Sequence, residues 1–445
     1  MNENRQKLNS LGLEIPSILL PQSVNMQKWP VIACDQFTQD RDYWEKVRTA
    51  ASGSPSTINL VFPEVFLSDD DAQKRITDIH LCMKNYLKDG VFGEPRNGFI
   101  YIERDTPYQK KRRGLITAVD LEQYDWKPDS RPLIRCTEGT VAERLPPRMD
   151  IRRGAPLELP HILLLIDDDT ESLLPALAGR AKKQAPVYNT PLMMDSGNVS
   201  GWFLDTEEDF GFIADKLDEL CRRSVSRYGD KNPFLFAVGD GNHSLAAAKG
   251  IWEEIKKADP VNSSSHPCRY ALAEIENIYD PAIQFEPIHR LVFNVGFDET
   301  LSILSQLPDF SCRPAAKAEE LPRLCAQRGA HSAAANCFGI ISRDCCMLAE
   351  TSAAGISTAC LQPLLDNYKG KSLSIDYIHD NEELFRLAAR NSGSTGILLP
   401  PVQKSGLFET VGRLGPLPRK SFSMGHSCEK RFYLECRSLL VHDEN

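Results

Sequence analysis

The sequence predicts a mixed α/β protein with two domains, and three observations support this expectation. Short apolar runs alternate with amphipathic stretches along the chain, which is the pattern of strands that alternate with helices. The chain has 445 residues, more than a single hydrophobic core usually organises. The pattern changes near residue 296. We therefore expect a larger mixed α/β domain over 1–295 and a smaller α/β domain over 296–445.

The first elements can be placed from side-chain periodicity. Residues 29–37 (WPVIACDQF) have the composition of a strand that runs into a polar loop, and 40–51 follows as a helix with acidic residues in its first turn. Residues 97–105 and 112–121 are apolar runs around a polar turn, which is typical of paired strands. Residues 208–229 form an amphipathic helix that ends at Gly229.

The middle and end of the chain contain further strands. Residues 269–280 and 286–296 have the composition of central strands. Residues 337–342 and 345–351 predict a strand pair in the smaller domain. The sequence contains no internal repeat.

Composition narrows the class of protein. The formal net charge of -9 argues against nucleic acid as a partner, because such binding needs a cationic surface. The longest aliphatic runs, such as 161–166, are too short to span a membrane, and the first residues lack the layout of a secretion signal. The 13 cysteines include no CxxC pair. We expect a cytoplasmic protein; the sequence does not set its oligomeric state.

The most informative stretch is 236–249 (FAVGDGNHSLAAAK), where an apolar strand meets a helix. Leu245, Ala248, Trp252 and Ile255 lie on one helical stripe, so a polar loop leads into the N-terminus of a buried helix. A helix N-terminus presents unpaired N–H groups and a positive dipole end, and phosphate is the anion that suits it best. The glycines allow close approach and three side chains add polar groups; these residues are Gly239, Gly241, Asn242, His243 and Ser244.

Two alternatives stay open at this loop. Asp240 would repel an anion unless it holds Mg²⁺ or orients another group. Gly-Asp-Gly-Asn is also ordinary turn chemistry, in which Asp240 or Ser244 only caps the helix. A Walker A pattern is absent, so any nucleotide is bound in another way.

The loop resembles the DG-x-H-R motif of the family of domain of unknown function 1015. Three more segments resemble that family in the same order, namely 134–140 (IRCTEGT), 286–292 (EPIHRLV) and 415–426 (GPLPRKSFSMGH). More distantly, the motif is similar to the ParB/sulfiredoxin-like superfamily, which includes free-serine kinases. The resemblance implies that the strand–loop–helix contacts phosphate or nucleotide, with ATP or ADP and Mg²⁺ as cofactors, and that the C-terminal loop returns to this site.

The resemblance also implies roles for single residues. Glu138 would be the general base, Asp240 the Mg²⁺ ligand, and Asn242 and His243 donors to phosphate oxygens. Asp35 lies in a loop where family members carry polar residues and is a substrate-site candidate.

Ser244 stands where the motif has Arg, which removes a fixed positive charge from the loop. Other cations could compensate, although each could equally be a surface charge, and Glu138 could be a structural partner of an arginine. His289 and Arg290 could face opposite sides of a strand. The candidate phosphate-binding residues outside the loop are Arg135, Arg144, Arg148, His289, Arg290 and Lys420.

These features predict a small-molecule kinase that moves a phosphoryl group from ATP or ADP to a hydroxyl such as that of serine. A phosphate-ester hydrolase could use the same pocket. A non-catalytic nucleotide-binding regulator of ParB-like type is the third possibility.

Overall fold

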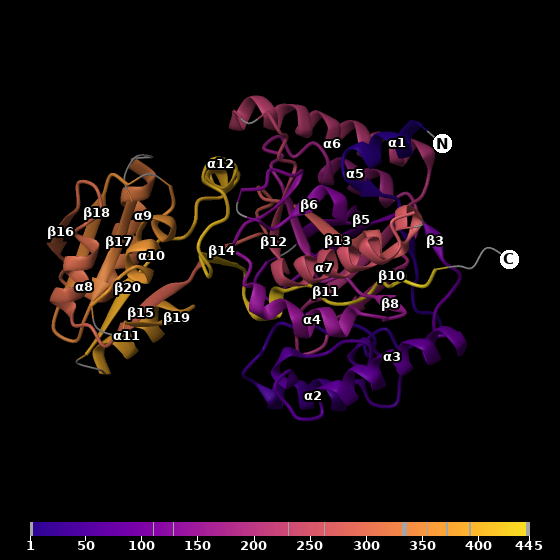
Figure 1. Ribbon diagram of the computed structural model, residues 1–445, viewed down its shortest axis with the longest axis horizontal. Coiled ribbons are helices and arrows are strands. Elements are labelled where there is room, and N and C mark those ends of the chain that lie inside the picture. Colours follow the sequence, from indigo (N-terminus) through magenta and orange to yellow (C-terminus); the bar gives the residue numbers. More distant parts are fainter. Residues whose placement is uncertain are drawn as a thin grey trace. The chain divides into compact units, whose positions relative to one another are not determined.

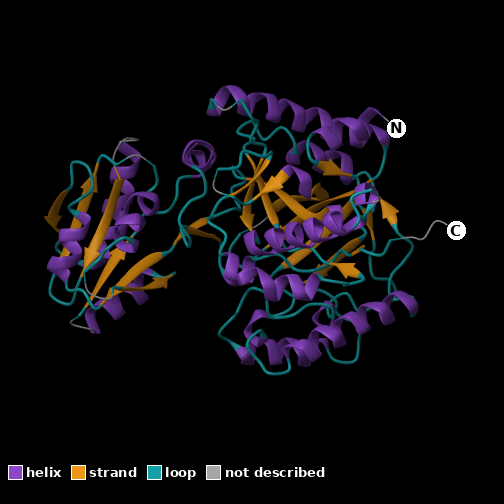
Figure 2. Cartoon of the chain, in the orientation of Figure 1, coloured by secondary structure: helices purple, strands orange, loops and turns teal. Residues whose placement is uncertain are grey.

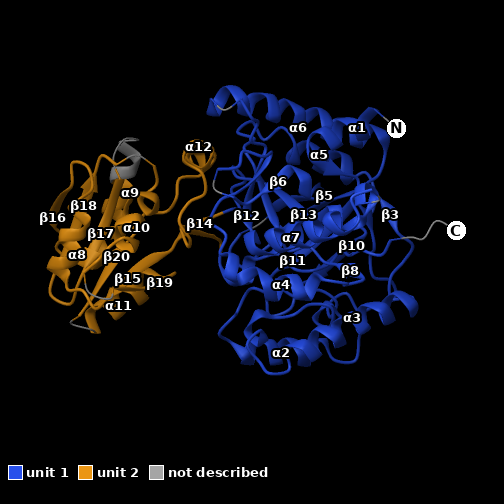
Figure 3. Cartoon of the chain, viewed as in Figure 1, with its two compact units in different colours: residues 1–283, 426–445 blue, residues 284–425 orange. Residues whose placement is uncertain are grey.

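Figure 1 shows a computed structural model of the chain, which describes residues 3–441 except 110, 128, 230, 262, 332–335, 354, 371–372 and 391–392. Helices and strands alternate along the described chain (Figure 2), so the predicted mixed α/β class is confirmed. The chain divides into two compact units (Figure 3). Unit 1 comprises Met1–Ile283 and His426–Asn445, and unit 2 comprises Gln284–Gly425.

The division differs from the predicted boundary at 295/296. β14 (Phe285–Pro287) pairs with β21 (Phe422–Met424), and β15 (His289–Phe293) pairs with strands that follow it in the chain, so both belong to unit 2. The chain then returns to unit 1 at His426, which removes the last residues from the smaller unit. Local periodicity locates strands but not their partners, which explains the difference.

Unit 1 is built on one mixed sheet, with strand order β10-β11-β4-β5-β13-β9-β12-β7-β6 and β1 paired to β5. β12 runs parallel to β7 and antiparallel to β9. Short two-stranded pairs, β2 with β3 and β8 with β22, complete the unit. The strands are β1 (Leu13–Glu14), β2 (Ser17–Ile18), β3 (Arg96–Asn97), β4 (Phe99–Asp105), β5 (Arg112–Asp120), β6 (Tyr124–Asp125), β7 (Ile134–Cys136), β8 (Leu157–Glu158), β9 (Leu163–Ile166), β10 (Tyr188–Pro191), β11 (Asn198–Leu204), β12 (Phe236–Asp240), β13 (Tyr270–Asn277) and β22 (Arg437–Ser438).

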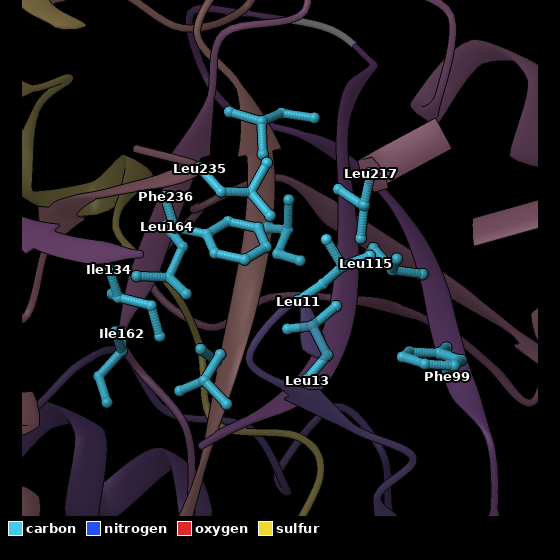
Figure 4. Packing of buried hydrophobic residues seen from close by; sticks show 14 of the residues in the cluster. Leu11, Leu13, Phe99, Leu115, Ile134, Ile162, Leu164, Leu217, Leu235 and Phe236 are labelled. Carbon is cyan, nitrogen blue, oxygen red and sulfur yellow. The ribbon is translucent and has the colours of Figure 1, made fainter. Parts of the chain in front are cut away.

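Both faces of this sheet are buried. Successive side chains of a strand point to opposite faces, so Phe99 and Tyr101 belong to one hydrophobic cluster and Ile100 and Ile102 to another. Figure 4 shows the first cluster, in which Leu115 and other strand residues pack together. Full burial of one such side chain contributes about 1.5–3 kcal/mol. Helices therefore cover the sheet on two sides.

Among the helices of unit 1, α6 begins and ends at capping residues. Thr206 accepts a hydrogen bond from the backbone N–H of Asp209 at 3.2 Å at the start of α6, and Gly229 ends it with φ 66°, as predicted. The helices are α1 (Glu3–Ser10), α2 (Arg41–Ala51), α3 (Ala72–Lys88), α4 (Leu145–Arg152), α5 (Leu174–Ala181), α6 (Glu207–Tyr228) and α7 (Asn242–Ala258), with single 3-10 turns such as η2 (Glu64–Phe66), η4 (Ala142–Arg144) and η8 (Ser427–Glu429).

The segment after unit 2, residues 426–441, packs against residues near the start of the chain. The backbone N–H of Ala33 donates to the carbonyl of Arg431 at 2.8 Å, and that of Tyr433 donates to the carbonyl of Val31 at 2.9 Å. The strand predicted over 29–37 is only an isolated bridge between Ile32 and Phe432. We call residues 426–441 the return segment.

The predicted strand–loop–helix is present. β12 ends at Asp240, Gly241 has φ 79°, and α7 begins at Asn242. The register of β12 against β9 shifts between Val238 and Asp240, so Gly239 lies at a β-bulge. The predicted stripe on the helix is confirmed, since Leu245, Ala248 and Trp252 are buried and Ile255 is partly buried.

Unit 2 is a six-stranded sheet in the order β16-β18-β17-β20-β15-β19, besides the β14–β21 pair. The strand pair predicted over 337–351 is confirmed by β17 and β18. In the described part of the whole chain, no helix combines the length and apolarity that crossing a bilayer requires. The remaining elements are β16 (Ser311–Pro314), β17 (Asn336–Ile341), β18 (Cys346–Thr351), β19 (Ser374–Ile378), β20 (Ser394–Leu398), α8 (Phe297–Leu304), α9 (Leu321–His331), α10 (Ser357–Asp366), α11 (Asn381–Arg390) and α12 (Lys404–Leu414).

His289 and Arg290 are both fully buried in unit 2. His289 Nδ1 accepts from the N–H of Leu399 at 3.1 Å, and its Nε2 lies 2.7 Å from Oδ1 of Asn381, so the neutral ring satisfies both partners. Burial is the main cause that lowers the pKa of His289 to about 4. This imidazole is therefore a neutral core residue whose two ring nitrogens already have partners, which does not fit the phosphate-binding role that the sequence suggested.

Arg290 holds the loop before β21. Its guanidinium donates to the carbonyls of Lys420 at 2.8 Å and Arg419 at 3.4 Å, and to Oε1 of Gln362 at 2.9 Å. These contacts join the two motif segments, 286–292 and 415–426, within unit 2. The arginine orders backbone and is not presented to an anion.

Gly241 should be the least replaceable glycine of the loop. A Cβ there would lie 3.1 Å from Cα of Ile162, and φ is left-handed, so Gly241→Ala should lower the free energy of unfolding by about 1–3 kcal/mol. Gly179→Ala, in open space on α5, is the matched control and should raise it by about 0.5–1 kcal/mol. Denaturant unfolding measures both; equal effects would contradict the assignment.

The depressed pKa of His289 makes unit 2 sensitive to acid. An unfolded histidine gains a proton below about pH 6.5, whereas His289 stays neutral in the fold down to about 4, so stability should fall as the pH drops between these values. Histidine NMR titration should find this pKa, assigned by the missing signal in His289→Gln. The variant should also lose stability less steeply in this pH window. A pKa near 6.5 would contradict the burial argument.

Candidate functional site

The site lies where β12 ends and α7 begins. Oδ2 of Asp240 is 3.2 Å from Nζ of Lys430, and its Oδ1 accepts from the backbone N–H of Gly241 at 3.0 Å. The Lys430 side chain is only 7% exposed. An ammonium group of the return segment is thus fixed beside the first turn of a 17-residue helix.

Lys430 is a cation that sequence reasoning missed. Ser244, which replaces the arginine of the motif, is half-buried in the first turn of α7 and carries no charge. Lys430 is 186 positions away in the chain and lies in no recognised motif. Only the docking of the return segment brings it to the loop, so no local signal could have identified it.

Asn242 and His243 stand at the start of α7. Oδ1 of Asn242 is buried and has no hydrogen-bond partner among the described residues. Nε2 of His243 accepts from the backbone N–H of Val141 at 3.3 Å, so the neutral ring carries its proton on Nδ1. His243 therefore connects the helix start to the loop after β7.

Glu138 lies in that loop. β7 runs parallel to β12 with Cys136 opposite Val238, so the residues that follow both strands leave the sheet at the same edge. The Oγ1 of Thr137 donates to the carbonyl of Val238 at 2.6 Å, which holds the two strand ends together. Glu138 is half-buried at this edge. Its role as general base stays a prediction.

Asp35 reaches the same site from the start of the chain. Its Oδ1 accepts from the Gln36 amide at 3.0 Å, and its Oδ2 is 3.9 Å from Nε2 of His161. Burial would raise the pKa of Asp35, but the His161 imidazole, the Gln36 amide and the Lys430 ammonium together hold it below the usual value. Asp35 is therefore ionised at neutral pH.

His161 and Tyr433 complete this side of the site, and neither belongs to a recognised motif. Nδ1 of His161 lies 2.8 Å from the hydroxyl of Tyr433, which also accepts from the N–H of Cys34 at 3.1 Å. A Cβ placed at Gly241 would be 3.4 Å from Cδ2 of His161, so the imidazole abuts the loop.

Glu64 and Arg148 flank Asp35. Glu64 on η2 forms an ion pair with Arg148 on α4, and both side chains are half-buried. Burial, helped by the charge of Asp35, raises the pKa of Glu64 against the lowering effect of Arg148. Of the three arginines that bracket Glu138 in the sequence, Arg148 is the one whose ion-pair partner interacts with Asp35.

The other two arginines have different positions. Arg135 donates to the carbonyls of Pro132 at 3.0 Å and Asn232 at 3.1 Å, and its guanidinium lies 4.7 Å from the ring centre of Phe234. Pro132, Asn232 and Phe234 come before β7 and β12 in the chain, whereas the site lies where these strands end. The Arg135 side chain therefore holds the backbone at the opposite end of the strands and does not reach the site. Arg144 is exposed on η4.

Lys420, the last predicted phosphate ligand, is exposed in unit 2, where its carbonyl accepts from Arg290. Asp240, the predicted Mg²⁺ ligand, has one partner at each oxygen, namely Lys430 and the N–H of Gly241, and its role as a metal ligand stays a prediction. Among the described residues, no three His, Cys, Asp or Glu side chains gather to hold a metal ion.

Several solved structures resemble this chain at low sequence identity. A free serine kinase in complex with AMP has a TM-score of 0.38 and 11% identity, covering 74% of this chain and 94% of that chain. SbnI with C-terminal truncation from Staphylococcus aureus has a TM-score of 0.37 and 10% identity, covering 72% and 85%. A conserved hypothetical protein from Pyrococcus furiosus has a TM-score of 0.34 and 11% identity, covering 72% and 90%.

TM-scores this low say nothing about the chemistry of the site in this chain. No curated protein matches the chain. The family model described as "Protein of unknown function (DUF1015)" matches residues 19–366, more than half of the sequence, so the chain belongs to this family, as its motifs predicted.

Proposed function

We propose that unit 1 is a small-molecule kinase that transfers a phosphoryl group from ATP or ADP to the hydroxyl of a metabolite such as serine. The observation that carries this proposal is the Lys430 ammonium, buried and 3.2 Å from Asp240 at the start of α7. It places a fixed positive charge beside the N-terminus of α7, where the positive end of the helix dipole also favours an anion such as phosphate.

The donor phosphates bind at the first turn of α7. Gly241 has a left-handed φ of 79°, which turns the chain into the helix and lets the N–H groups of its first turn face an anion. Lys430 has three N–H donors, so it can keep its ion pair with Asp240 and also donate to a phosphate oxygen. The amide of Asn242 and the imidazole of His243 lie on the same turn and orient the phosphates.

The acceptor hydroxyl needs a base, and two carboxylates lie near this edge. We assign the base to Asp35, which is ionised and senses the charge of Lys430, and keep Glu138 as the second candidate. As the hydroxyl oxygen attacks the terminal phosphorus, its proton passes to Asp35. The new P–O bond forms while the bond to the nucleotide oxygen breaks, and that oxygen leaves with the electron pair.

Loss of Lys430 should weaken nucleotide binding. A charged hydrogen bond contributes about 1.5–3 kcal/mol, so Lys430→Met should raise the Kd for ADP about 10–100-fold by calorimetry. The double variant Lys430→Met/Asp240→Asn avoids an unpaired buried carboxylate and should show the same loss if folding is intact. Lys74→Met, on the exposed face of α3, is the control and should bind as wild type does. An unchanged Kd for ADP in the double variant would contradict the role of Lys430 in binding phosphate.

The two candidate bases can be separated by turnover. With serine, Mg²⁺ and ATP or ADP, Asp35→Asn should lower kcat about 10²–10⁴-fold while nucleotide affinity changes little. Glu138→Gln should keep most of the activity. The reverse result would make Glu138 the base. Phosphate release without an acceptor would favour the hydrolase, and stabilisation by nucleotide without product would favour a regulator.

A further inference from the structure

A chain of hydrogen bonds leads from the backbone of Cys34 through Tyr433 to His161. The backbone N–H of Cys34 can only donate, so the oxygen of Tyr433 accepts that bond at 3.1 Å. The phenol keeps its own proton, which can be donated to Nδ1 of His161, 2.8 Å away. Burial raises the pKa of Tyr433 well above its usual value, so this proton is retained.

An imidazole that accepts at Nδ1 carries its proton on Nε2 when it is neutral. Nε2–H of His161 therefore points to the side of Asp35. The distance from Nε2 to Oδ2 of Asp35 is 3.9 Å, longer than a direct hydrogen bond. A hydroxyl oxygen of a substrate could lie about 2.8 Å from both Nε2 of His161 and Oδ2 of Asp35, and so hydrogen-bond to both atoms at once.

We propose that His161 is a catalytic residue that binds the acceptor hydroxyl, and that Tyr433 is the positioning residue that fixes its tautomer. The hydroxyl oxygen accepts from Nε2–H of His161 and donates its proton to Asp35. On attack the proton moves to Asp35, while His161 keeps its own. His161 abuts Gly241, so the attacking oxygen lies next to the loop that holds the phosphate. This inference rests on the proposed function and adds the group that aims the acceptor.

The tautomer can be measured without turnover. In the full chain labelled with ¹⁵N-histidine, His161 should show an unprotonated Nδ1 and a protonated Nε2 at neutral pH, assigned by the signal lost in His161→Gln. Tyr433→Phe removes the donor to Nδ1 and should give a mixture of both tautomers. A wild-type ring protonated at Nδ1 would overturn the inference.

Turnover tests the role itself. His161→Leu should lower kcat about 10²-fold and raise the KM for the acceptor, with the Kd for ADP within about twofold of wild type. His161→Gln keeps an N–H donor near the Nε2 position and should recover about tenfold of the loss. Tyr433→Phe should fall between wild type and His161→Leu. Circular dichroism shows whether each variant is folded.

The two levels of proposal fail differently. No transfer by the wild-type chain would overturn the proposed function, and this role with it. Transfer by the wild type with unchanged kcat and KM in His161→Leu would overturn only the role of His161. Loss of ADP affinity in His161→Leu equal to that in Lys430→Met would place His161 at the phosphate instead, against the inference.

Discussion

The site depends on the buried guanidinium of Arg431. This side chain is 2% exposed and pairs with Glu274 on β13 and with Glu435 of its own segment. Burying a charge costs several kcal/mol unless it is paired, so a shift of the return segment by one residue would be strongly unfavourable. The fixed register delivers Lys430 to Asp240 and Tyr433 to His161. The two ion pairs of this one guanidinium therefore position both Lys430 and Tyr433 in the site.

The same constraint makes the site non-local. Asp35, His161 and Asp240 come from before unit 2, whereas Lys430 and Tyr433 come from after it, because unit 2 is inserted between residues 283 and 426. A second buried arginine holds the later part of the return segment, because Nε of Arg437 donates to Glu158 at 2.7 Å. Loop-closure entropy opposes contacts across so long a separation, so the charges and apolar contacts of the return segment must outweigh it. The loop around Gly241 is local in sequence, but the groups around it come together only when the return segment packs against residues near the start of the chain.

This division explains what the sequence could predict. The strand, the left-handed Gly241 and the buried stripe of α7 follow from local periodicity and turn chemistry, and they were predictable. Lys430 and His161 were not, because their role depends on partners far along the chain. The motif arginines were misinterpreted for another reason. Arg290 donates to backbone carbonyls, and an arginine that orders backbone has the same sequence pattern as one that binds phosphate.

In this chain the cation at the loop is Lys430 of the return segment, whereas the family motif has an arginine at the position of Ser244. This difference changes how an anion can be bound. A guanidinium at position 244 would face phosphate as a planar fork on the helix itself. Lys430 instead offers a compact charge that Asp240 already shares at 3.2 Å, so phosphate must take part of an ammonium that has an internal partner. Three donors allow this sharing, and Asp240 then orients the cation instead of repelling the anion. In the proposed site, Asp240 is therefore the partner that keeps Lys430 in position before phosphate binds, which gives this carboxylate a role in an anion-binding loop.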